Sequence, residues 1–462
     1  MAPEFREQGG AATMDPNPLV RWLTSRISRW LATPERLLRR RQRFEKARAA
    51  SGARHVVEYF HQIDDGYSHL AAQLLAPLRE RYDIDLMCHL VDAPSDGNTP
   101  EPELLLDLAR RDASRIASHY GLRFPDCPAP PNADQIATAL ALLSARTGGD
   151  FVDRTTQIGA AFWAGDDGAL NALVDSLGAA SESELRQRLI AGNARRSELG
   201  HYSGAMFYCA GEWYWGVDRL YHLEQRLTAL GLDRQPDAQP LAARPSGQIP
   251  AQPQLLHDNQ TLTLEIYVSL RSPYTAIFFD PVVDLARRTG VRLVVRPVLP
   301  MVMRGVPLTR EKGVYIFTDV AREARAANID FGRFYDPIGE PIRRCYSLYP
   351  WACEQGKGTA LLSSFLRAAF ALGVNTNRDA GLRTVVETAG LDWRVAKTLF
   401  GCSAWQEELE RNRRAMYDAG LWGVPSLRLL NRRGEQVLAT WGQDRLWLLE
   451  IEIQRQLAHR SD

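Results

Sequence analysis

The sequence lacks a C-x-x-C pair. Its six cysteines are scattered, and the closest two, Cys345 and Cys353, are eight positions apart. Disulfide exchange needs a second thiol beside the first, so this spacing argues against a disulfide oxidoreductase. Thiols spread over a long chain in this way are typical of reduced, structural cysteines, and we expect a cytoplasmic protein.

Long apolar runs are also missing, and the net charge is close to zero. The chain has 462 residues, of which 45% are apolar and 24% charged, with a formal net charge of +1. No run reaches the roughly 18 apolar residues of a membrane span, and acidic residues near the start argue against a secretory signal. The balanced charge gives no reason to expect a nucleic-acid partner. No histidine or cysteine cluster has the spacing of a metal site, so we expect no metal.

The first 50 residues differ in composition from the rest. Residues 1–18 are rich in glycine, alanine and proline and are predicted to be disordered. Residues 19–48 follow as a basic amphipathic helix, with Leu23, Ile27 and Trp30 at helical spacing. The preferred role for this helix is packing on its own domain or on a partner subunit. The alternative is contact with an anionic membrane surface or RNA.

Two long stretches, 51–234 and 259–462, show the same order of predicted elements. Each opens with a strand, a loop, a helix and a second strand, a β-α-β unit whose strands we expect to be parallel. A helical segment follows, and each stretch then returns with a hairpin and a last helix. Residues 235–258, between the two, are rich in proline and are predicted to be a linker.

The two stretches also match residue by residue. An offset of 207 brings Glu58 onto Glu265 and Tyr67 onto Tyr274, and the pattern W-G-x-D-R-L recurs at 215–220 and 441–446. We therefore interpret the chain as two copies of one α/β domain. The two copies could form a pseudo-dimer within one chain, and the sequence leaves the oligomeric state open.

Four segments of the second copy carry a family resemblance. They are Tyr267-Val268-Ser269-Leu270-Arg271-Ser272-Pro273-Tyr274, Lys312-x-x-Tyr315-x-x-x-Asp319-x-x-Arg322, Gly423-Val424-Pro425-Ser426 and Trp441-Gly442-Gln443-Asp444-Arg445-Leu446. Together they resemble the DsbA-like branch of the thioredoxin fold, in which a helical domain interrupts the sheet. Within it, the second copy is similar to kappa-class glutathione transferases and 2-hydroxychromene-2-carboxylate isomerases. The resemblance implies two tandem thioredoxin-like domains, each with a helical insertion.

The resemblance also implies a catalytic position at Ser272. This serine stands where redox members of the family carry a low-pKa cysteine, at a helix start that favours an anion. There it would donate a hydrogen bond to the thiolate of bound glutathione. The alternative reading is that Ser272 only caps the helix before Pro273.

Four further residues are implied to bind glutathione. Val424 and a cis Pro425 would present backbone to the glutathione peptide, and Gln443 and Asp444 would hold its γ-glutamyl end. Asp444 at the start of the last helix has the alternative role of a cap.

A substrate pocket is implied near the same helix start. Tyr274, Lys312 and Tyr315 are candidates to line it. Asp319 and Arg322 are spaced for a helical ion pair, which we interpret as structural.

The first copy departs from the pattern where chemistry would occur. Asp65 aligns with Ser272, and Met206 aligns with Pro425. We expect this copy to be degenerate, serving as a lid, a scaffold or a stand-in for a dimer partner.

The sequence therefore predicts a glutathione-dependent isomerase or transferase with a small conjugated or aromatic substrate. The alternative is a non-catalytic thioredoxin-fold binding or scaffold protein, favoured by Arg271 beside Ser272 and by the polar segment 331–357, which could remodel or close the pocket. A thiol oxidoreductase acting through Cys345 or Cys353 is the third reading.

Overall fold

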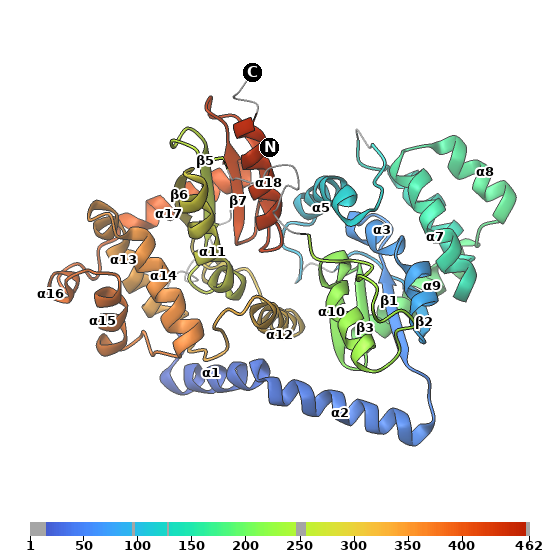
Figure 1. The fold of residues 1–462 in the computed structure, drawn as a ribbon, viewed down its shortest axis with the longest axis horizontal. Coiled ribbons are helices and arrows are strands. Elements are labelled where there is room, and N and C mark those ends of the chain that lie inside the picture. The colour runs from blue at the N-terminus through green and yellow to red at the C-terminus, as the bar shows by residue number, and fades with distance from the viewer. Residues whose placement is uncertain (1–14, 95–97, 127–128, 246–255, 459–462) are drawn as a thin grey trace. The chain divides into compact units, whose positions relative to one another are not determined.

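The computed structural model describes most of the chain (Figure 1), namely residues 15–94, 98–126, 129–245 and 256–458. It forms two compact units. The N-terminal unit is Leu37–Pro245, and the C-terminal unit combines the residues up to Arg36 with those from Ser246 onward. The part of the predicted disordered start at 1–14 and the linker residues 246–255 lie outside the described residues.

The N-terminal unit is built on a four-stranded sheet with the order β2-β1-β3-β4. β1 pairs in parallel with β2 and antiparallel with β3, which forms a hairpin with β4. In chain order the strands are Val56–His61, Asp85–Leu90, Met206–Cys209 and Glu212–Trp215. Nearly all of β1 is buried, so both faces of this strand are covered.

Helices make up the rest of the secondary structure of this unit. They are α2 (Pro34–Ser51), α3 (Gly66–Ala72), α4 (Leu75–Arg81), α5 (Pro102–Ile116), the short 3₁₀ turn η2 (Ala117–Tyr120), α6 (Ala133–Ser144), α7 (Gly148–Trp163), α8 (Asp167–Leu177), α9 (Glu182–Glu198) and α10 (Gly216–Ala229). The segment between β2 and β3 supplies α5 to α9, which is the predicted helical insertion.

The C-terminal unit has a second sheet with the order β6-β5-β7-β8 and the same strand directions. Its strands are β5 (Thr263–Val268), β6 (Arg292–Pro297), β7 (Ser426–Leu430) and β8 (Gln436–Trp441). Its helical elements are α1 (Pro18–Ala32), α11 (Pro273–Thr289), η3 (Met301–Arg304), α12 (Arg310–Ala326), α13 (Glu340–Glu354), α14 (Gly358–Arg367), η4 (Ala368–Leu372), α15 (Asp379–Thr388), α16 (Trp393–Ala396), α17 (Ala404–Asp418) and α18 (Leu446–Ala458).

The basic N-terminal segment forms two helices, where the sequence pattern predicted one over 19–48. α1 ends at Ala32 and α2 begins at Pro34. Thr33 between them is extended, with φ −69° and ψ 133°. A residue that precedes proline is pushed out of the helical region by the proline ring, which explains the break.

Each central strand carries a buried carboxylate at the same place. In β1, Glu58 accepts hydrogen bonds from Arg195 at 2.7 Å and 2.9 Å and contacts His89 Nε2 at 2.9 Å. Burial raises the pKa of Glu58, but these hydrogen bonds outweigh burial and hold it at about 2. In β5, Glu265 accepts from Arg296 at 2.8 Å. The predicted match of Glu58 with Glu265 therefore places a buried, ion-paired carboxylate at the same position of the two central strands, although its arginine comes from α9 in the first unit and from β6 in the second.

Candidate functional site

Ser272 lies at the junction of β5 and α11. Its Oγ accepts a hydrogen bond from the Thr275 N–H at 3.2 Å, and Pro273 occupies the first helical turn. The capping role that the sequence suggested is therefore present. The Ser272 Oγ–H also donates to the Val424 carbonyl at 3.2 Å. This second contact ties the helix start to a distant loop.

That loop holds the predicted cis proline. The Val424–Pro425 peptide bond is cis, as the sequence predicted. The Pro425 carbonyl accepts from the Gly442 N–H at 2.9 Å, which brings the turn between β8 and α18 against the loop. Gly442 has φ +83°, a value that side-chain-bearing residues rarely adopt. Ser272, Val424 and Pro425 are thus assembled beside the turn that contains Gln443 and Asp444.

Gln443 is buried within that turn. Its Nε2 donates to Glu323 Oε2 at 3.0 Å and contacts Asp444 Oδ1 at 3.4 Å. Glu323, on α12, is only 1% exposed. Sequence reasoning missed this glutamate, because spacing alone does not distinguish it from the exposed Glu311 of the same helix. The last helix begins at Leu446, so Asp444 precedes it by two residues rather than opening it.

Lys312 lies in the first turn of α12, where Thr309 caps the helix. Burial lowers the pKa of Lys312 to about 8. Its Nζ is 5.9 Å from the centre of the Trp422 ring, which stacks on Trp441 at 5.6 Å. Trp422 directly precedes the Gly423–Pro425 loop, so it links Lys312 to the cis proline. The sequence reading had not singled out Trp422.

The tryptophan pair leaves room only for glycine at position 423. A Cβ built on Gly423 would lie 2.4 Å from Trp441 Nε1, well inside van der Waals contact. The glycine of the Gly-Val-Pro-Ser segment is therefore required by the close approach of this indole.

The two tyrosines of the predicted pocket differ in their contacts. Tyr274 donates its hydroxyl to Asp319 Oδ2 at 2.8 Å, and Asp319 also binds Arg322, which confirms the structural ion pair. Tyr274 therefore joins α11 to α12. Tyr315 is half-buried on α12, one turn after Lys312. Its role in lining a pocket stays a prediction.

Arg271, beside Ser272, is engaged away from the serine. Its guanidinium makes a paired contact with both Asp336 carboxylate oxygens, at 3.0 Å and 3.1 Å. Asp336 is itself buried, and its N–H donates to Ser25 Oγ on α1 at 3.0 Å. Helix α1 and the loop that precedes α13 thus hold the backbone just before Ser272.

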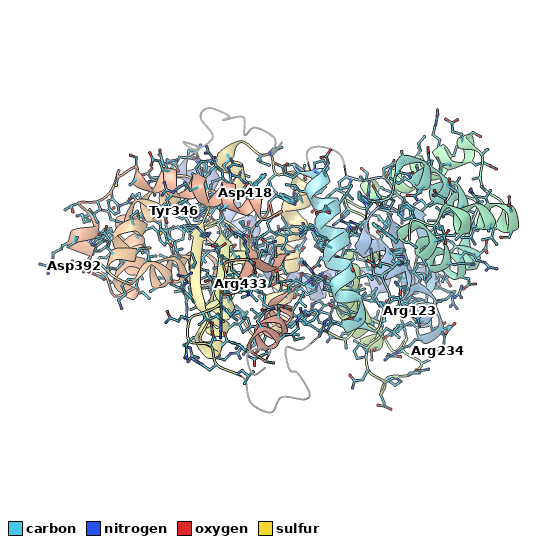
Figure 2. The ribbon with its side chains drawn as sticks, turned by 90° about the horizontal axis from the view of Figure 1, so that it is seen from above. Arg123, Arg234, Tyr346, Asp392, Asp418 and Arg433 are labelled. Atoms are coloured by element: carbon cyan, nitrogen blue, oxygen red, sulfur yellow. The ribbon has the colours of Figure 1, made fainter. Side chains whose placement is uncertain are left out.

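The polar segment 331–357 contacts the residues between β5 and Ser272. Besides Asp336 it contributes Tyr346, labelled in Figure 2, whose hydroxyl oxygen accepts from the Leu270 N–H at 3.3 Å. The Tyr346 hydroxyl also donates to the Val298 carbonyl at 3.1 Å. This segment, for which the sequence offered the role of remodelling or closing the pocket, therefore positions the residues that lead to Ser272.

Part of the chain matches a known protein family. Residues 263–454 match the family model of the DSBA-like thioredoxin domain. This part of the C-terminal unit is a DSBA-like thioredoxin domain, and α1 lies outside the match. The resemblance inferred from its four segments is confirmed for this half of the chain, and all matched residues lie in the C-terminal unit.

Named relatives match the same share of the chain. The 2-hydroxychromene-2-carboxylate isomerase of Sphingobium xenophagum is 27% identical over 199 residues, which are 41% of this chain and 97% of the isomerase. A solved 2-hydroxychromene-2-carboxylate isomerase is 19% identical, covering 43% of this chain and 98% of its own, with a TM-score of 0.36. A probable DsbA oxidoreductase from Streptomyces coelicolor is 20% identical, covering 43% and 90%, with a TM-score of 0.33.

The thiols described in the DSBA-like domain are not at the start of α11. Cys345 and Cys353 lie on α13, and Cys402 precedes α17. Burial raises the pKa of the Cys345 thiol well above its usual range and also raises that of Cys353. A thiol with a raised pKa is rarely ionised and reacts slowly in disulfide exchange. Among the described side chains, no cluster could hold a metal ion.

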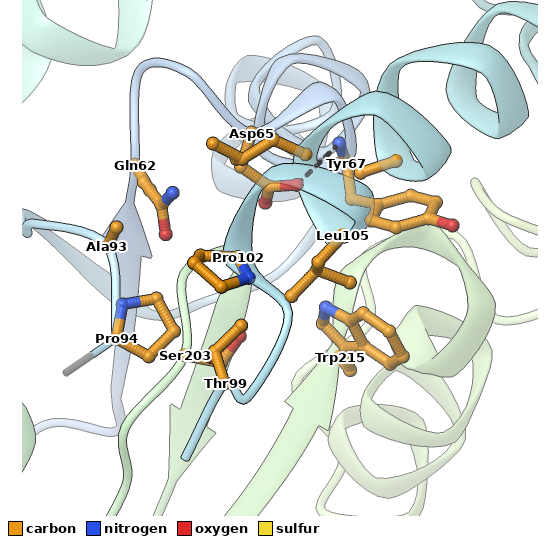
Figure 3. A pocket seen from close by; sticks show the side chains of 12 residues that line it. Gln62, Asp65, Tyr67, Ala93, Pro94, Thr99, Pro102, Leu105, Ser203 and Trp215 are labelled. Atoms are coloured by element: carbon orange, nitrogen blue, oxygen red, sulfur yellow. Dashed lines mark hydrogen bonds between the residues drawn. The ribbon is translucent and has the colours of Figure 1, made fainter. Parts of the chain in front are cut away.

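The matching position in the N-terminal unit is occupied by Asp65. Its carboxylate caps α3 by accepting from the N–H groups of Tyr67 at 3.2 Å and Ser68 at 3.1 Å. Burial raises the pKa of Asp65 to about 6, although the hydrogen bonds from Ser68 and Tyr67 oppose this. Figure 3 shows Asp65 at the edge of a pocket of about 40 Å³ that is also lined by Gln62 and Trp215.

The sheet pairing corrects one detail of the predicted match. Phe60 pairs with Met206 in the first sheet, and Tyr267 pairs with Ser426 in the second. Because Phe60 and Tyr267 are equivalent, Met206 corresponds to Ser426. The residue at the place of Pro425 is therefore Ala205, not Met206. Sequence comparison alone was wrong by one position, because no shared side chain marks this loop.

Proposed function

We propose that the DSBA-like domain is a glutathione-dependent isomerase or transferase with a small conjugated or aromatic substrate. The observation that carries the proposal is the Ser272 hydroxyl at the start of α11, 3.2 Å from the carbonyl of the cis-proline loop. A helix start favours an anion. Since none of the described thiols lies there, the anion would come with a ligand. Similarity to an isomerase of Sphingobium xenophagum supports the same class of reaction.

The residues around Ser272 offer contacts that glutathione could use. The Val424 N–H has no hydrogen-bond partner among the described residues, so an extended peptide could pair with it as an added strand. Asp444 is half-buried and offers a carboxylate for the γ-glutamyl ammonium group. Gln443, oriented by Glu323, lies beside it.

The proposed chemistry assigns each residue a separate task. When bound, glutathione supplies a thiolate whose addition to an electron-poor double bond and later loss would give isomerisation, and whose retention would give a conjugate. Ser272 would turn its hydroxyl from the Val424 carbonyl to the sulfur. Together with the start of α11, it would favour the thiolate over the thiol. The Lys312 ammonium would add positive charge near the loop.

Binding of glutathione is tested by calorimetry and thermal unfolding of the whole chain. At about 100 times its dissociation constant, glutathione should stabilise the protein by about 2.7 kcal/mol. Asp444→Ala and Gln443→Ala should weaken binding at least tenfold. Asp218→Ala, the equivalent change in the N-terminal unit, is the matched control and should leave binding unchanged. Absence of any stabilisation, or an equal effect of all three variants, would contradict the proposal.

A second function, binding of an extended peptide without catalysis, is favoured by the same unpaired Val424 N–H. It predicts that the protein binds glutathione but does not turn over a conjugated enone. In that case wild type and Ser272→Ala would give equal rates with the enone and glutathione.

We also infer that the N-terminal unit is a degenerate second copy that acts as a scaffold, which would make the chain a pseudo-dimer. The equivalent sheets, the helix caps at Asp65 and Ser272, and the buried carboxylates of Glu58 and Glu265 support this. A cytoplasmic location, where glutathione is kept reduced, accords with the proposed function.

A further inference from the structure

Helix α1 turns its polar side chains toward the C-terminal unit and its apolar side chains away from it. Arg21 and Ser25 are 1% and 2% exposed. The Arg21 guanidinium donates to the carbonyl oxygens of Asp336 at 2.7 Å and Ile338 at 2.6 Å. Six apolar side chains of the same helix are 47% to 70% exposed, namely those of Leu19, Val20, Trp22, Leu23, Ile27 and Trp30.

This orientation is held along the whole helix. Arg29 donates to the Phe334 carbonyl at 2.8 Å, and Arg325 on α12 donates to the Ala32 carbonyl at 3.1 Å. Rotation of α1 to bury its apolar face would break these bonds and take the buried Arg21 guanidinium away from the two carbonyl oxygens that accept from it, which is unfavourable. A contiguous apolar face that is held outward in this way indicates an interaction surface.

Charge identifies the kind of partner. Arg26 lies over the Trp22 ring at 5.0 Å, and Arg36 lies over the Trp30 ring at 4.3 Å, so guanidinium groups border the exposed indoles. Helix α1 itself carries three arginines and no acidic residue, although the whole chain has a net charge of only +1. Indole rings flanked by arginine suit the boundary between lipid headgroups and acyl chains.

We propose that α1 lies in the plane of an anionic lipid bilayer, with its six exposed apolar side chains inserted and its basic neighbours at the headgroups. None of the described helices is long and apolar enough to cross a membrane, so the contact would be peripheral. Pairing of this face with a second copy of the chain is disfavoured, because it would bring two strongly basic segments together.

Vesicle flotation with the full chain tests the proposal. We expect binding to vesicles of phosphatidylcholine with 30% phosphatidylglycerol, and at least tenfold weaker binding to phosphatidylcholine alone. Binding should weaken in high salt, because screening shortens the reach of the charges. Arg26→Gln should weaken it about fivefold at low salt, the effect of one basic side chain near an anionic surface.

The apolar contribution is tested by Leu23→Gln combined with Trp30→Gln, which should reduce binding at least tenfold. Ile190→Gln is the matched control, because Ile190 is 61% exposed on α9 of the other unit. Thermal unfolding checks that the variants fold. Equal binding of wild type and the double variant would overturn the proposal. So would concentration-dependent dimerisation in sedimentation experiments that the double variant abolishes, since α1 would then be a contact between copies.

Discussion

The two units place opposite chemistry at the start of an equivalent helix. In the C-terminal unit, Ser272 caps α11 with a neutral hydroxyl that retains a proton to donate. In the N-terminal unit, Asp65 caps α3 with a carboxylate that itself occupies the place of an anion. A thiolate could therefore be stabilised beside Ser272 but would be repelled by Asp65. One fold position can thus host a ligand in one unit and complete its own helix in the other.

The features that both units share lie away from that position. Tyr67 donates to Asp112 and Tyr274 donates to Asp319, each at 2.8 Å, and both pairs join the first helix after the central strand to the first α-helix after the second strand. These bonds stabilise helix packing and do not depend on a ligand. Similarity between the units is therefore concentrated in residues that build the fold.

The largest expected difference between the units is in their response to acid. His61, His69 and His201 are buried in the N-terminal unit, and burial lowers their pKa values to about 3, 4 and 3. A lowered folded-state pKa contributes stability that is complete above pH 6.5 and is lost as pH falls. Each histidine should cost roughly 2 kcal/mol by pH 5. His257 is the only histidine among the described residues of the C-terminal unit.

We therefore expect the N-terminal unit to unfold between pH 6 and 4 while the C-terminal unit stays folded. Asp65 acts in the opposite direction, because its raised pKa contributes stability that is lost as pH rises from about 4 to 6. This effect is smaller than that of three histidines. Limited proteolysis over this pH range, with cleavage sites mapped by mass spectrometry, shows which unit unfolds first. Cleavage that begins in the C-terminal unit would contradict the prediction.

Exchange of the two cap residues is the next largest test. Ser272→Asp should place a carboxylate where the thiolate is proposed to bind and reduce turnover with glutathione and a conjugated enone more than 100-fold. Ser272→Ala, which only removes the donor, should reduce it about 100-fold. Asp65→Ser is the matched control and should leave the rate unchanged. A rate that falls equally in all three variants would show that the loss is not specific to Ser272.

A smaller effect is expected where Arg271 and its counterpart differ. Arg271 pairs with the buried Asp336, whereas the equivalent Asp64 accepts from Gln62 Nε2 at 2.9 Å within its own loop. Asp336→Asn keeps the backbone contacts to α1 but removes the charge opposite Arg271. It should destabilise the C-terminal unit by about 2 kcal/mol, because Arg271 is only partly exposed. Denaturant unfolding measures this, with Asp64→Asn as the control that should change stability by less than about 0.5 kcal/mol.

The smallest expected effect is the pH dependence that Lys312 adds to ligand binding. Burial lowers the pKa of Lys312 to about 8, so its charge is present below pH 8 and is lost above it. The affinity for S-methylglutathione, whose sulfur cannot ionise, should fall about threefold to fivefold between pH 7 and 8.5. Calorimetry of wild type and Lys312→Gln measures the change. If the variant shows the same pH profile as wild type, Lys312 does not contribute to ligand binding.

Local sequence determined much of this protein. Ser272 before Pro273 specifies a capped helix start, because this preference acts within a few residues. The cis bond before Pro425 was implied by the family resemblance of Gly423–Ser426 and is present in the structure. The order of predicted strands and helices along the chain indicated two similar domains. The residue match between these domains predicted that Glu58 and Glu265 are equivalent.

Only the tertiary structure decided what depends on distant partners. It paired Arg271 with Asp336 and Gln443 with Glu323, residues 65 and 120 positions apart. It also showed that Ala205, and not Met206, corresponds to Pro425, because strand pairing defines register more strictly than a loop sequence does. For α1, helical spacing predicted one apolar face and one polar face. Periodicity defines which residues share a face, but only packing decides which face meets the protein, and here it is the polar one.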